Sequence, residues 1–335
     1  MDIAIIGASG YAGSELYRLA DAHPRLNVVV ATAASQAGRR VSEAVPALAA
    51  IAGDQRYAPT AAALTAEVDT AFIALPHGES QSLVPDLLAR GVRVIDLGAD
   101  FRLKDAATYA HWYGHEHVAP QYLGDAVYGL VERHRHELPG ARLVASPGCY
   151  PTASILALGP FADAGLLERG SVIVNALSGT SGAGRSLSER LQFSRLAGNA
   201  EAYGLLNHRH TAEMEMELGE GVLFTPHLLP VSRGMLVTAY ARVRDSNLDP
   251  LALLREAYAD EPFVVVQDEP PALKDAVGSN LCVVSARIDP RTGWLIALSA
   301  IDNLIKGAAG QAIQAWNVAT GLAETTGLPR AGVTP

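Results

Sequence analysis

The stretch IAIIGASGYAGSELYRLADA (residues 3–22) joins an apolar run to an amphipathic segment through a turn rich in glycine. Its first four residues predict a buried strand, and the periodic segment predicts a helix over residues 12–22. Gly7, Gly10 and Gly13 lie between the two, where they permit a tight turn and bring backbone amides close to a pyrophosphate. The spacing GxxGxxG differs from the usual GxGxxG, so a plain strand–turn–helix corner remains the alternative. We favour a dinucleotide-binding turn.

Apolar runs and amphipathic segments continue to alternate as far as residue 145. Continuous apolar strands with helices between them predict a parallel sheet covered on both faces. Beyond Cys149, longer strand-like runs with few helices predict an antiparallel or mixed sheet. We therefore expect an α/β chain, with a Rossmann-type doubly wound domain over residues 1–145 and 303–335 and an α+β substrate and dimerisation domain with a mixed sheet over residues 146–302. The predicted strands are residues 3–6, 26–31, 70–75, 92–96, 142–145, 172–176, 236–243, 263–266, 281–289 and 294–301, and the further helices are residues 80–90, 150–164 and 307–320.

The composition of the chain excludes several classes of partner and indicates more than one domain. The chain has 335 residues, more than one hydrophobic core usually holds, and a net charge of −9 without any basic run. Nucleic acid and anionic membranes are therefore not expected as partners, whereas a small anion remains possible. Two cysteines, Cys149 and Cys282, indicate reduced thiols. Because no leader pattern and no apolar run of ~20 residues is present, we expect a cytoplasmic protein, and we expect no metal.

The second predicted strand indicates which dinucleotide is bound. NAD-binding domains usually place an acidic residue at the end of this strand to hold the ribose hydroxyls. Here the sequence reads VVVATAASQAGRR (residues 28–40), without an acid. Ser35, Arg39 and Arg40 follow instead and are candidates for binding a 2′-phosphate, which favours NADP over NAD. The alternative is that the two arginines merely face solvent in a loop.

The peptide ASPGCYPTASILALG (residues 145–159) places Cys149 directly after a Pro-Gly turn and at the start of a predicted helix. The helix dipole and free amides would there stabilise a thiolate, which a nucleophilic cysteine requires near neutral pH. Cys282 lies inside a strand-like run and fits the commoner role of a small buried hydrophobe. An acid/base group is offered by the peptide HRHTAE (residues 208–213), although spacing does not decide between its two histidines.

Seven motifs in one order, taken together, resemble the N-acetyl-γ-glutamyl-phosphate reductase family of arginine biosynthesis, within the aspartate-semialdehyde dehydrogenase-like superfamily. The resemblance covers nearly the whole chain and is far more specific than one glycine turn. The motifs are GASGYAG (7–13), LPHG (75–78), DLGADFRL (96–103), SPGCYPT (146–152), SGTSGAGR (178–185), HRHTAE (208–213) and DNLIKGAAGQA (302–312).

The resemblance implies a reaction and roles for individual residues. Cys149 would attack the γ-acyl phosphate as nucleophile, and NADPH would reduce the resulting thioester to a semialdehyde. His210 is the first choice for acid/base catalyst and His208 the second, with Glu213 as a carboxylate that orients them. The resemblance also implies a homodimer or homotetramer formed through the mixed sheet.

The same resemblance implies groups that bind the substrate phosphate and the cofactor. Arg102 would bind the phosphate, with Arg185 as a second candidate, and Lys306 would lie near the nicotinamide. Residues expected to contact the cofactor are Gly7, Ser9, Gly10, Tyr11, Gly13, Ser35, Arg39, Arg40, Pro76, Gly182 and Asn303.

Three alternatives remain open at this stage. A sister reductase acts on carrier-bound α-aminoadipyl phosphate in lysine synthesis, but the residues Tyr150-Pro151 after the cysteine match the arginine-pathway form. A non-phosphorylating aldehyde dehydrogenase needs no phosphate site, which Arg102 and Arg185 argue against. A cofactor-binding regulator without chemistry would leave Cys149 unreactive.

Overall fold

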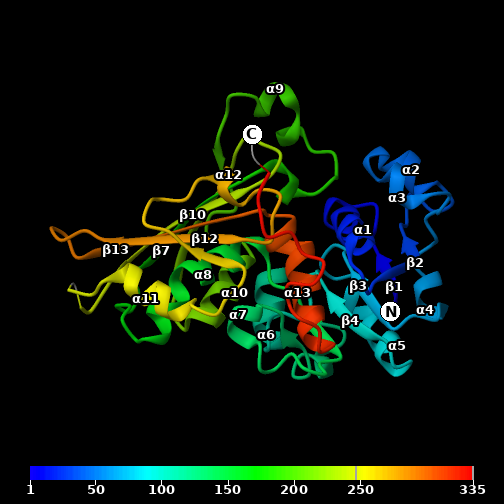
Figure 1. Cartoon of the computed structure of the whole chain (residues 1–335), viewed down its shortest axis with the longest axis horizontal. Helices are drawn as coiled ribbons and strands as arrows, with labels where there is room; N and C mark the ends of the chain where they lie inside the picture. The colour runs from blue at the N-terminus through cyan, green and yellow to red at the C-terminus, as the bar shows by residue number, and fades with distance from the viewer. Residues whose placement is uncertain (246, 334–335) are drawn as a thin grey trace. The chain divides into compact units, whose positions relative to one another are not determined.

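The chain forms two compact units in a computed structural model that describes residues 1–245 and 247–333 (Figure 1). The first unit comprises Met1–Pro147 and Ala308–Leu328. The second comprises Gly148–Gly307 and the C-terminal residues from Pro329. The sequence placed residues 303–307 and the C-terminus in the first domain, whereas the structure assigns both to the second unit.

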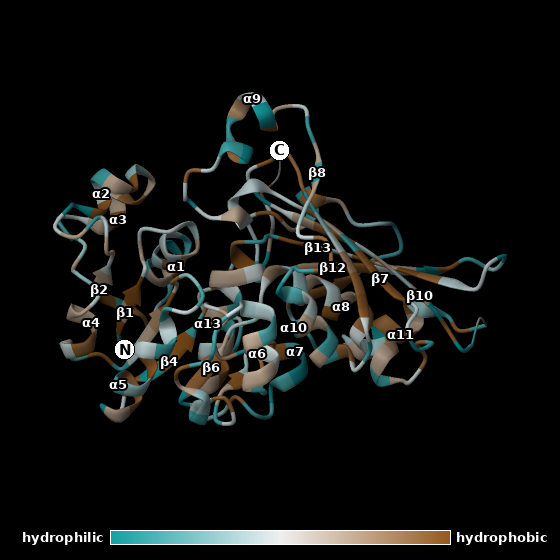
Figure 2. Cartoon of the chain, turned by 180° about the vertical axis from the view of Figure 1, so that it is seen from behind, coloured by the Kyte–Doolittle hydropathy of each residue, from teal (hydrophilic) through white to brown (hydrophobic). Residues whose placement is uncertain are grey.

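The first unit contains a six-stranded sheet in the order β2-β1-β3-β4-β6-β5, in which every recorded strand pair is parallel. Strands β1 and β3 are buried almost throughout, and Figure 2 shows hydrophobic colour on β1, β4 and β6. This agrees with the doubly wound sheet predicted from the continuous apolar runs. The strands are β1 (Asp2–Ile6), β2 (Asn27–Thr32), β3 (Thr70–Ile73), β4 (Arg93–Asp96), β5 (Val127–Tyr128) and β6 (Leu143–Ala145).

Helices cover this sheet and connect its strands. The C-terminal helix α13 contacts α1, α7 and β4, and its Trp316 lies fully buried beside Phe72 and His23. The chain leaves β1 toward β2 on one side and returns to β3 on the other. A ligand of such a sheet binds where this reversal occurs, at the carboxyl ends of β1 and β3. The helices are α1 (Tyr11–Ala22), α2 (Val41–Ala44), α3 (Ala49–Ala52), α4 (Ala62–Thr65), α5 (Val84–Ala89), α6 (Ala106–Tyr113), α7 (Val131–His134) and α13 (Gly310–Ala319).

The second unit contains a seven-stranded mixed sheet in the order β11-β12-β13-β10-β7-β9-β8. The pairs β11–β12 and β7–β9 are parallel, and the other pairs are antiparallel. The mixed sheet expected from the sequence is thus confirmed. The strands are β7 (Val172–Ser178), β8 (Glu201–Ala202), β9 (Val222–Leu228), β10 (Met235–Arg242), β11 (Val264–Val266), β12 (Cys282–Ile288) and β13 (Trp294–Ile301).

Helix α8 forms the core of this unit. It packs against β10, β12 and β13 on one side and against α10 and α11 on the other, so residues 150–161 are all buried. Apolar residues on every side of the helix make this burial favourable. Strands β7 and β10 alternate between buried and half-buried residues, because α8 covers only one face of the sheet. The helices are α8 (Cys149–Asp163), α9 (Phe193–Leu196), α10 (His210–Leu218), α11 (Pro250–Ala257) and α12 (Leu273–Ala276).

Two predicted helices differ from the structure. The segment predicted as a helix over residues 80–90 begins with a 3-10 turn, Ser80–Ser82, and becomes α-helical only at Val84. The last predicted helix begins as a π-helix, Ile305–Ala309, in which the Gly307 amide donates to the Asp302 carbonyl five residues earlier at 2.9 Å. Strand β9 and helices α6, α10 and α11 were not predicted. Across residues 1–245 and 247–333, no helix has both the length and the apolar character that a membrane crossing requires.

Candidate active site

Cys149 is the first residue of α8, as the sequence predicted. Gly148 precedes it in an extended conformation and has no side chain to cap the helix. The Gly148 amide donates to Oε1 of Glu213 at 2.7 Å, which ties the start of α8 to α10. Cys149 is partly exposed, whereas Cys282 is fully buried in β12. The helix dipole stabilises a thiolate at this position, so Cys149 has the environment of a nucleophile.

Two imidazoles lie beside the residue that follows the nucleophile. The Tyr150 ring contacts those of His208 and His210, with centroids 5.4 Å and 5.9 Å away, and the two imidazoles are 4.9 Å apart. The backbone amide of His210 donates to Nδ1 of His208 at 3.3 Å. Burial, reinforced by the charge of Arg209, lowers the pKa of His208 to about 4. His208 is therefore neutral at pH 7, and its Nδ1 serves as an acceptor for the first turn of α10.

Two tyrosines extend this cluster. The hydroxyl oxygens of Tyr150 and Tyr203 are 2.8 Å apart, and Tyr203 also lies beside the His208 ring. Burial raises the pKa of Tyr203 to about 12, and the negative charge of a Cys149 thiolate contributes to the rise. Burial and the same thiolate also raise the pKa of Tyr150. Both phenols therefore remain neutral hydrogen-bonding groups near Cys149.

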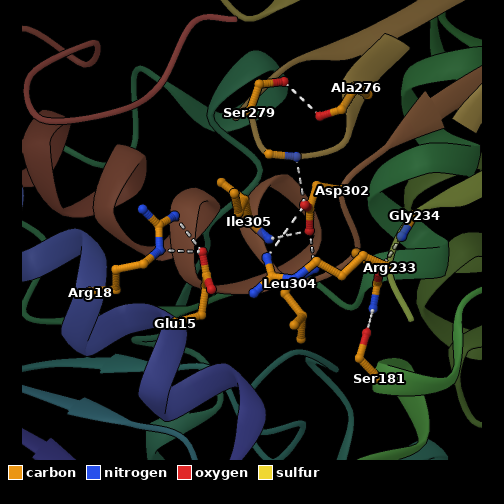
Figure 3. A network of polar contacts seen from close by, with 12 residues as sticks. Glu15, Arg18, Ser181, Arg233, Gly234, Ala276, Ser279, Asp302, Leu304 and Ile305 are labelled. Carbon is orange, nitrogen blue, oxygen red and sulfur yellow. Dashed lines mark hydrogen bonds and ion pairs between the residues drawn. The ribbon is translucent and has the colours of Figure 1, made fainter. Parts of the chain in front are cut away.

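The segment after β13 borders Cys149 from the other side. Asp302 is fully buried; its Oδ1 accepts from the amides of Leu304 at 2.8 Å and Ile305 at 3.1 Å, and its Oδ2 accepts from the Gly278 amide at 2.9 Å (Figure 3). These bonds fix the π-helical turn that carries Gly307. A β-carbon added to Gly307 would lie 2.7 Å from Cβ of Cys149, so only glycine leaves the nucleophile undisturbed.

Asn303 holds two loops of the same unit together. Its Oδ1 accepts from the Gly234 amide at 2.8 Å, and its Nδ2 donates to Oγ of Ser181 at 2.9 Å. Gly182 lies beside this contact, where an added β-carbon would be 3.1 Å from Oγ of Ser178. Lys306 is fully buried with its ammonium 5.7 Å from the centre of the Phe263 ring. Asn303, which the resemblance linked to the cofactor, therefore also orders two loops of the second unit.

The glycine turn of the first unit has the predicted geometry. Gly7 has φ +87°, and a β-carbon there would lie 2.4 Å from the Ala74 carbonyl oxygen, at the end of β3. A β-carbon on Gly13 would lie 2.3 Å from the Gly7 carbonyl oxygen. Gly10 is the residue before α1 and leaves the first amides of that helix without a side chain over them. The turn thus fits a pyrophosphate, which takes hydrogen bonds from such amides. Of the other residues expected there, Ser9 is half-buried, whereas Tyr11 and Pro76 are exposed.

The residues expected to select NADP lie beyond β2, and all are exposed. Arg39 donates to Oε1 of Gln36 at 3.0 Å and to the Glu43 carbonyl at 2.9 Å. Arg40 forms an ion pair with Asp54 at 3.2 Å, and Ser35 lies four residues before Arg39 in the same turn. Both guanidinium groups are exposed, and exposed contacts of this kind are weak.

Arg102 and Arg185 have different environments. Arg102 is 6% exposed; its Nε donates to the Ser146 carbonyl at 2.7 Å and its Nη2 to the Leu97 carbonyl at 2.9 Å. It therefore anchors the segment that leads to the nucleophile as well as carrying a positive charge. Arg185 is exposed in the loop after the 3-10 turn Thr180–Ala183.

Two family models match consecutive parts of the chain. The NAD-binding domain of semialdehyde dehydrogenases matches residues 2–141, and the dimerisation domain of semialdehyde dehydrogenases matches residues 149–303. N-acetyl-γ-glutamyl-phosphate reductases from Dehalococcoides mccartyi and Symbiobacterium thermophilum are 45% and 46% identical to the chain. The alignments cover 99% and 98% of this chain and 98% of each relative. The chain belongs to the N-acetyl-γ-glutamyl-phosphate reductase family.

Solved structures at much lower sequence identity share the fold of this reductase family member. Aspartate semialdehyde dehydrogenase II from Vibrio cholerae, complexed with ASA, superposes with a TM-score of 0.71 at 17% identity, over 95% of this chain and 97% of that one. The Candida albicans aspartate semialdehyde dehydrogenase with NADP gives a TM-score of 0.67 at 14% identity, over the same shares of the two chains. At these identities the likeness establishes the α/β architecture, and it confirms the predicted fold class.

Sequence reasoning missed three residues of the second unit of this reductase. Gly307 lies against Cys149, Tyr203 is hydrogen-bonded to Tyr150, and Arg190 lies against Tyr203. Tyr203 and Arg190 are in the long connection between β7 and β9, where no periodic pattern marks them. Gly307 lies inside a quoted motif, but its role depends on contact with a residue far away in sequence.

A buried pair of carboxyl groups lies at the end of β4 in the first unit. Asp96 and Asp100 are both fully buried, and the Ser80 hydroxyl lies 3.0 Å from Oδ2 of Asp96 and 2.8 Å from Oδ2 of Asp100. Asp100 also accepts from the Gly78 amide at 2.7 Å and from the Tyr109 hydroxyl at 2.8 Å. The pair thus holds the loop that follows β3. Burial, followed by the charge of Asp100, raises the pKa of Asp96 to about 7.

This raised pKa makes stability depend on pH. The folded chain keeps a proton on Asp96 that the unfolded chain, with a carboxyl pKa of ~3.9, has lost. The resulting stabilisation is fully present below pH ~4 and is lost as the pH rises through about 7. Asp96→Asn mimics the neutral form, so we expect its melting temperature at pH 8 to exceed the wild-type value by ~2–4 °C, and we expect this difference to shrink steadily as the pH falls from 7 toward 5. Thermal unfolding from pH 5 to 8 measures this, and parallel curves for the two proteins would contradict it.

Proposed function

We propose that this chain catalyses the NADPH-dependent reductive dephosphorylation of N-acetyl-L-glutamyl 5-phosphate to N-acetyl-L-glutamate 5-semialdehyde, in arginine biosynthesis. The observation that carries the proposal is Cys149, partly exposed at the start of α8 and followed directly by Tyr150, whose ring contacts His208 and His210. The full-length similarity to reductases of that name supports this substrate over carrier-bound α-aminoadipyl phosphate.

The chemistry follows from the residues of the second unit. The Cys149 thiolate attacks the acyl carbon, the bond to the phosphate oxygen breaks, and inorganic phosphate leaves with the negative charge. NADPH, when bound, supplies the hydride that reduces the thioester. The collapse of the resulting tetrahedral species breaks the carbon–sulfur bond and restores the thiolate. Backbone amides at the start of α8 are available to stabilise the oxyanion.

We assign the acid/base role to His210 and a positioning role to His208. His208 is neutral, with a pKa of about 4, and its Nδ1 accepts from the His210 amide. His208 therefore orients the first turn of α10, which carries the His210 ring. Glu213 accepts a hydrogen bond from the Gly148 amide. It therefore orients the start of α8, and not the two histidines as expected from the sequence.

The glycine turn with Gly7, Gly10 and Gly13 holds the pyrophosphate of NADP(H), with Ser9, Tyr11 and Pro76 around it, and Ser35, Arg39 and Arg40 are the groups available for the 2′-phosphate. In the second unit, Gly182 and Asn303 complete the set of cofactor residues. Arg102 and Arg185 supply positive charge for the substrate phosphate. These assignments rest on the family motifs together with the fitted geometry of the turn.

We further propose that the enzyme is a cytoplasmic homo-oligomer, a dimer or tetramer, that pairs through the mixed sheet. The family model for this unit is a dimerisation domain. Support comes from the sheet face that α8 does not cover, where Ile173, Tyr240 and Ile296 form one half-buried row across β7, β10 and β13. Half-exposed apolar rows of this kind are typical of subunit interfaces.

Phosphate dependence tests the proposed reaction. The purified protein is assayed in the aldehyde-oxidising direction with N-acetylglutamate 5-semialdehyde and NADP, and formation of NADPH is followed by absorbance. We expect turnover to require inorganic phosphate, because only phosphate releases the acyl group from Cys149 as the acyl phosphate. Full turnover without phosphate would identify a non-phosphorylating aldehyde dehydrogenase instead.

A further inference from the structure

Arg190 lies at the end of a chain of aromatic contacts that begins beside the nucleophile. It belongs to the 3-10 turn Glu189–Leu191, in the connection between β7 and β8. Its guanidinium carbon lies 4.5 Å from the centre of the Tyr203 ring. The Tyr203 hydroxyl is hydrogen-bonded to that of Tyr150, the residue directly after Cys149. The positive charge of Arg190 thus lies against Tyr203, the member of the Tyr150–Tyr203 pair that is farther along the chain from Cys149.

Two of the three guanidinium nitrogen atoms of Arg190 lack an acceptor among the described residues. Nε and Nη2 are both buried, and no described residue accepts a hydrogen bond from either atom. These two atoms share one edge of the guanidinium plane, the edge with which arginine binds both oxygens of a carboxylate or phosphate. A buried donor without an acceptor is destabilising, so such an edge is unusual unless a ligand completes it.

A carboxylate of the protein lies nearby but does not fill this role. Oε1 of Glu201 is 3.7 Å from Nε of Arg190, beyond hydrogen-bond distance. The other carboxylate oxygen of Glu201 faces Arg195 at 3.9 Å. The cation–π contact with Tyr203 holds the Arg190 guanidinium in place, while Nε and Nη2 keep their capacity to donate to an anion.

We propose that the Nε–Nη2 edge of Arg190 binds the α-carboxylate of the acyl substrate. The inference rests on the proposed function and names the part of the substrate that this residue recognises. The substrate carries two anionic groups, and the phosphate is attached directly to the carbon that Cys149 attacks. Three carbons separate the α-carboxylate from that acyl carbon. The Tyr150–Tyr203 pair separates Arg190 from the nucleophile, so its edge fits the distant carboxylate and a phosphate group fits it poorly.

Replacement of Arg190 combined with a modified substrate tests this assignment. Arg190→Gln keeps the approximate size of the side chain and removes the fork and its charge. We expect kcat/KM for N-acetylglutamate 5-semialdehyde to fall about 100-fold, the loss typical of a buried charged pair of hydrogen bonds. For the α-carboxamide of the same aldehyde we expect kcat/KM to change less than about 3-fold, because this substrate offers the Arg190 guanidinium no anion to bind. Arg190→Lys, which keeps the charge without the fork, should recover only part of the loss.

Arg195→Gln is the matched control, because Arg195 faces the same Glu201 carboxylate from an exposed position. We expect this variant to retain wild-type kinetics with both aldehydes. Equal losses of Arg190→Gln on the carboxylate and the carboxamide would overturn the proposal and leave Arg190 as a support for Tyr203. A raised KM of Arg190→Gln for inorganic phosphate would overturn the proposal and identify Arg190 as part of a phosphate site. Unchanged kinetics of this variant would also overturn it and leave Arg190 as a partner of Glu201 alone. A wild-type protein inactive on both aldehydes would contradict the proposed function itself, independently of Arg190.

Discussion

Cys149→Ser abolishes turnover of the acyl phosphate, with an expected loss of at least about 10³-fold in kcat, and leaves NADPH binding unchanged. The physical reason is ionisation: a thiol at the start of α8 forms a thiolate near neutral pH, whereas the hydroxyl of serine does not. Serine has nearly the same size as cysteine, so the fold is not disturbed. The measurement is NADPH oxidation under saturating substrate, together with NADPH binding by fluorescence titration.

Cys282→Ala provides the control for this experiment. Cys282 is fully buried in β12. The Cys282→Ala variant should therefore lose about 1 kcal/mol of unfolding free energy and keep almost all of its activity. Iodoacetamide at pH 7 should label Cys149 rapidly and Cys282 only on unfolding. Turnover retained by Cys149→Ser, or equal slow labelling of both cysteines, would refute the assignment of the nucleophile.

Gly307→Ala should lower kcat by about 10- to 100-fold while binding of NADPH remains. The added methyl group would lie 2.7 Å from Cβ and 3.2 Å from Cα of Cys149. Neither atom belongs to the end of a flexible side chain, so the first turn of α8 or the π-helical turn must move. The Asp302 hydrogen bonds hold the π-helical turn, and the displacement therefore falls mainly on Cys149. Misplacement of a reacting group by ~1 Å reduces rates by factors of this size.

The control for this second prediction is Gly124→Ala. Gly124 has no atom within 4 Å of an added β-carbon and no left-handed φ, so alanine should leave both activity and stability unchanged. The unfolding free energy adds a test that does not depend on catalysis. We expect Gly307→Ala to cost roughly 1–3 kcal/mol in the wild type and much less in a Cys149→Gly background, where the crowded β-carbon is absent. An equal cost of Gly307→Ala in both backgrounds would show that the added methyl group does not displace Cys149.

Local patterns in the sequence were sufficient for the parts of the site that depend on neighbouring residues. The glycine turn at residues 7–13 and the position of Cys149 at the start of a helix both follow from short-range rules for strands, turns and helix starts. The mixed sheet also followed from the long apolar runs. Strand β9 was missed because Pro226 and His227 interrupt its apolar pattern, and α10 was missed because its HTAEMEMEL sequence has little amphipathic character.

Contacts between distant segments were beyond the reach of the sequence. Tyr203 is 53 residues from Tyr150, with which it shares a hydrogen bond, and no local signal links them. Gly307 resembles any helical glycine until its distance from Cys149 is known. The histidine pair could be found by composition, but the separate roles of His208 and His210 depend on burial and on one backbone hydrogen bond. Each of these features is a property of tertiary packing.

The burial of α8 on every side has a consequence for how reductases of this kind diversify. Substitutions along α8 disturb the most tightly packed part of the second unit, so the nucleophile is preserved together with the stability of that unit. The connection that carries Arg190 is different, since Leu187 and Phe193 within it are 103% and 85% exposed. Mutations there leave stability almost unaffected, and such loops accept sequence change readily. With the proposed role of Arg190, a change in this loop alters substrate recognition while the thiol chemistry at the start of α8 stays the same.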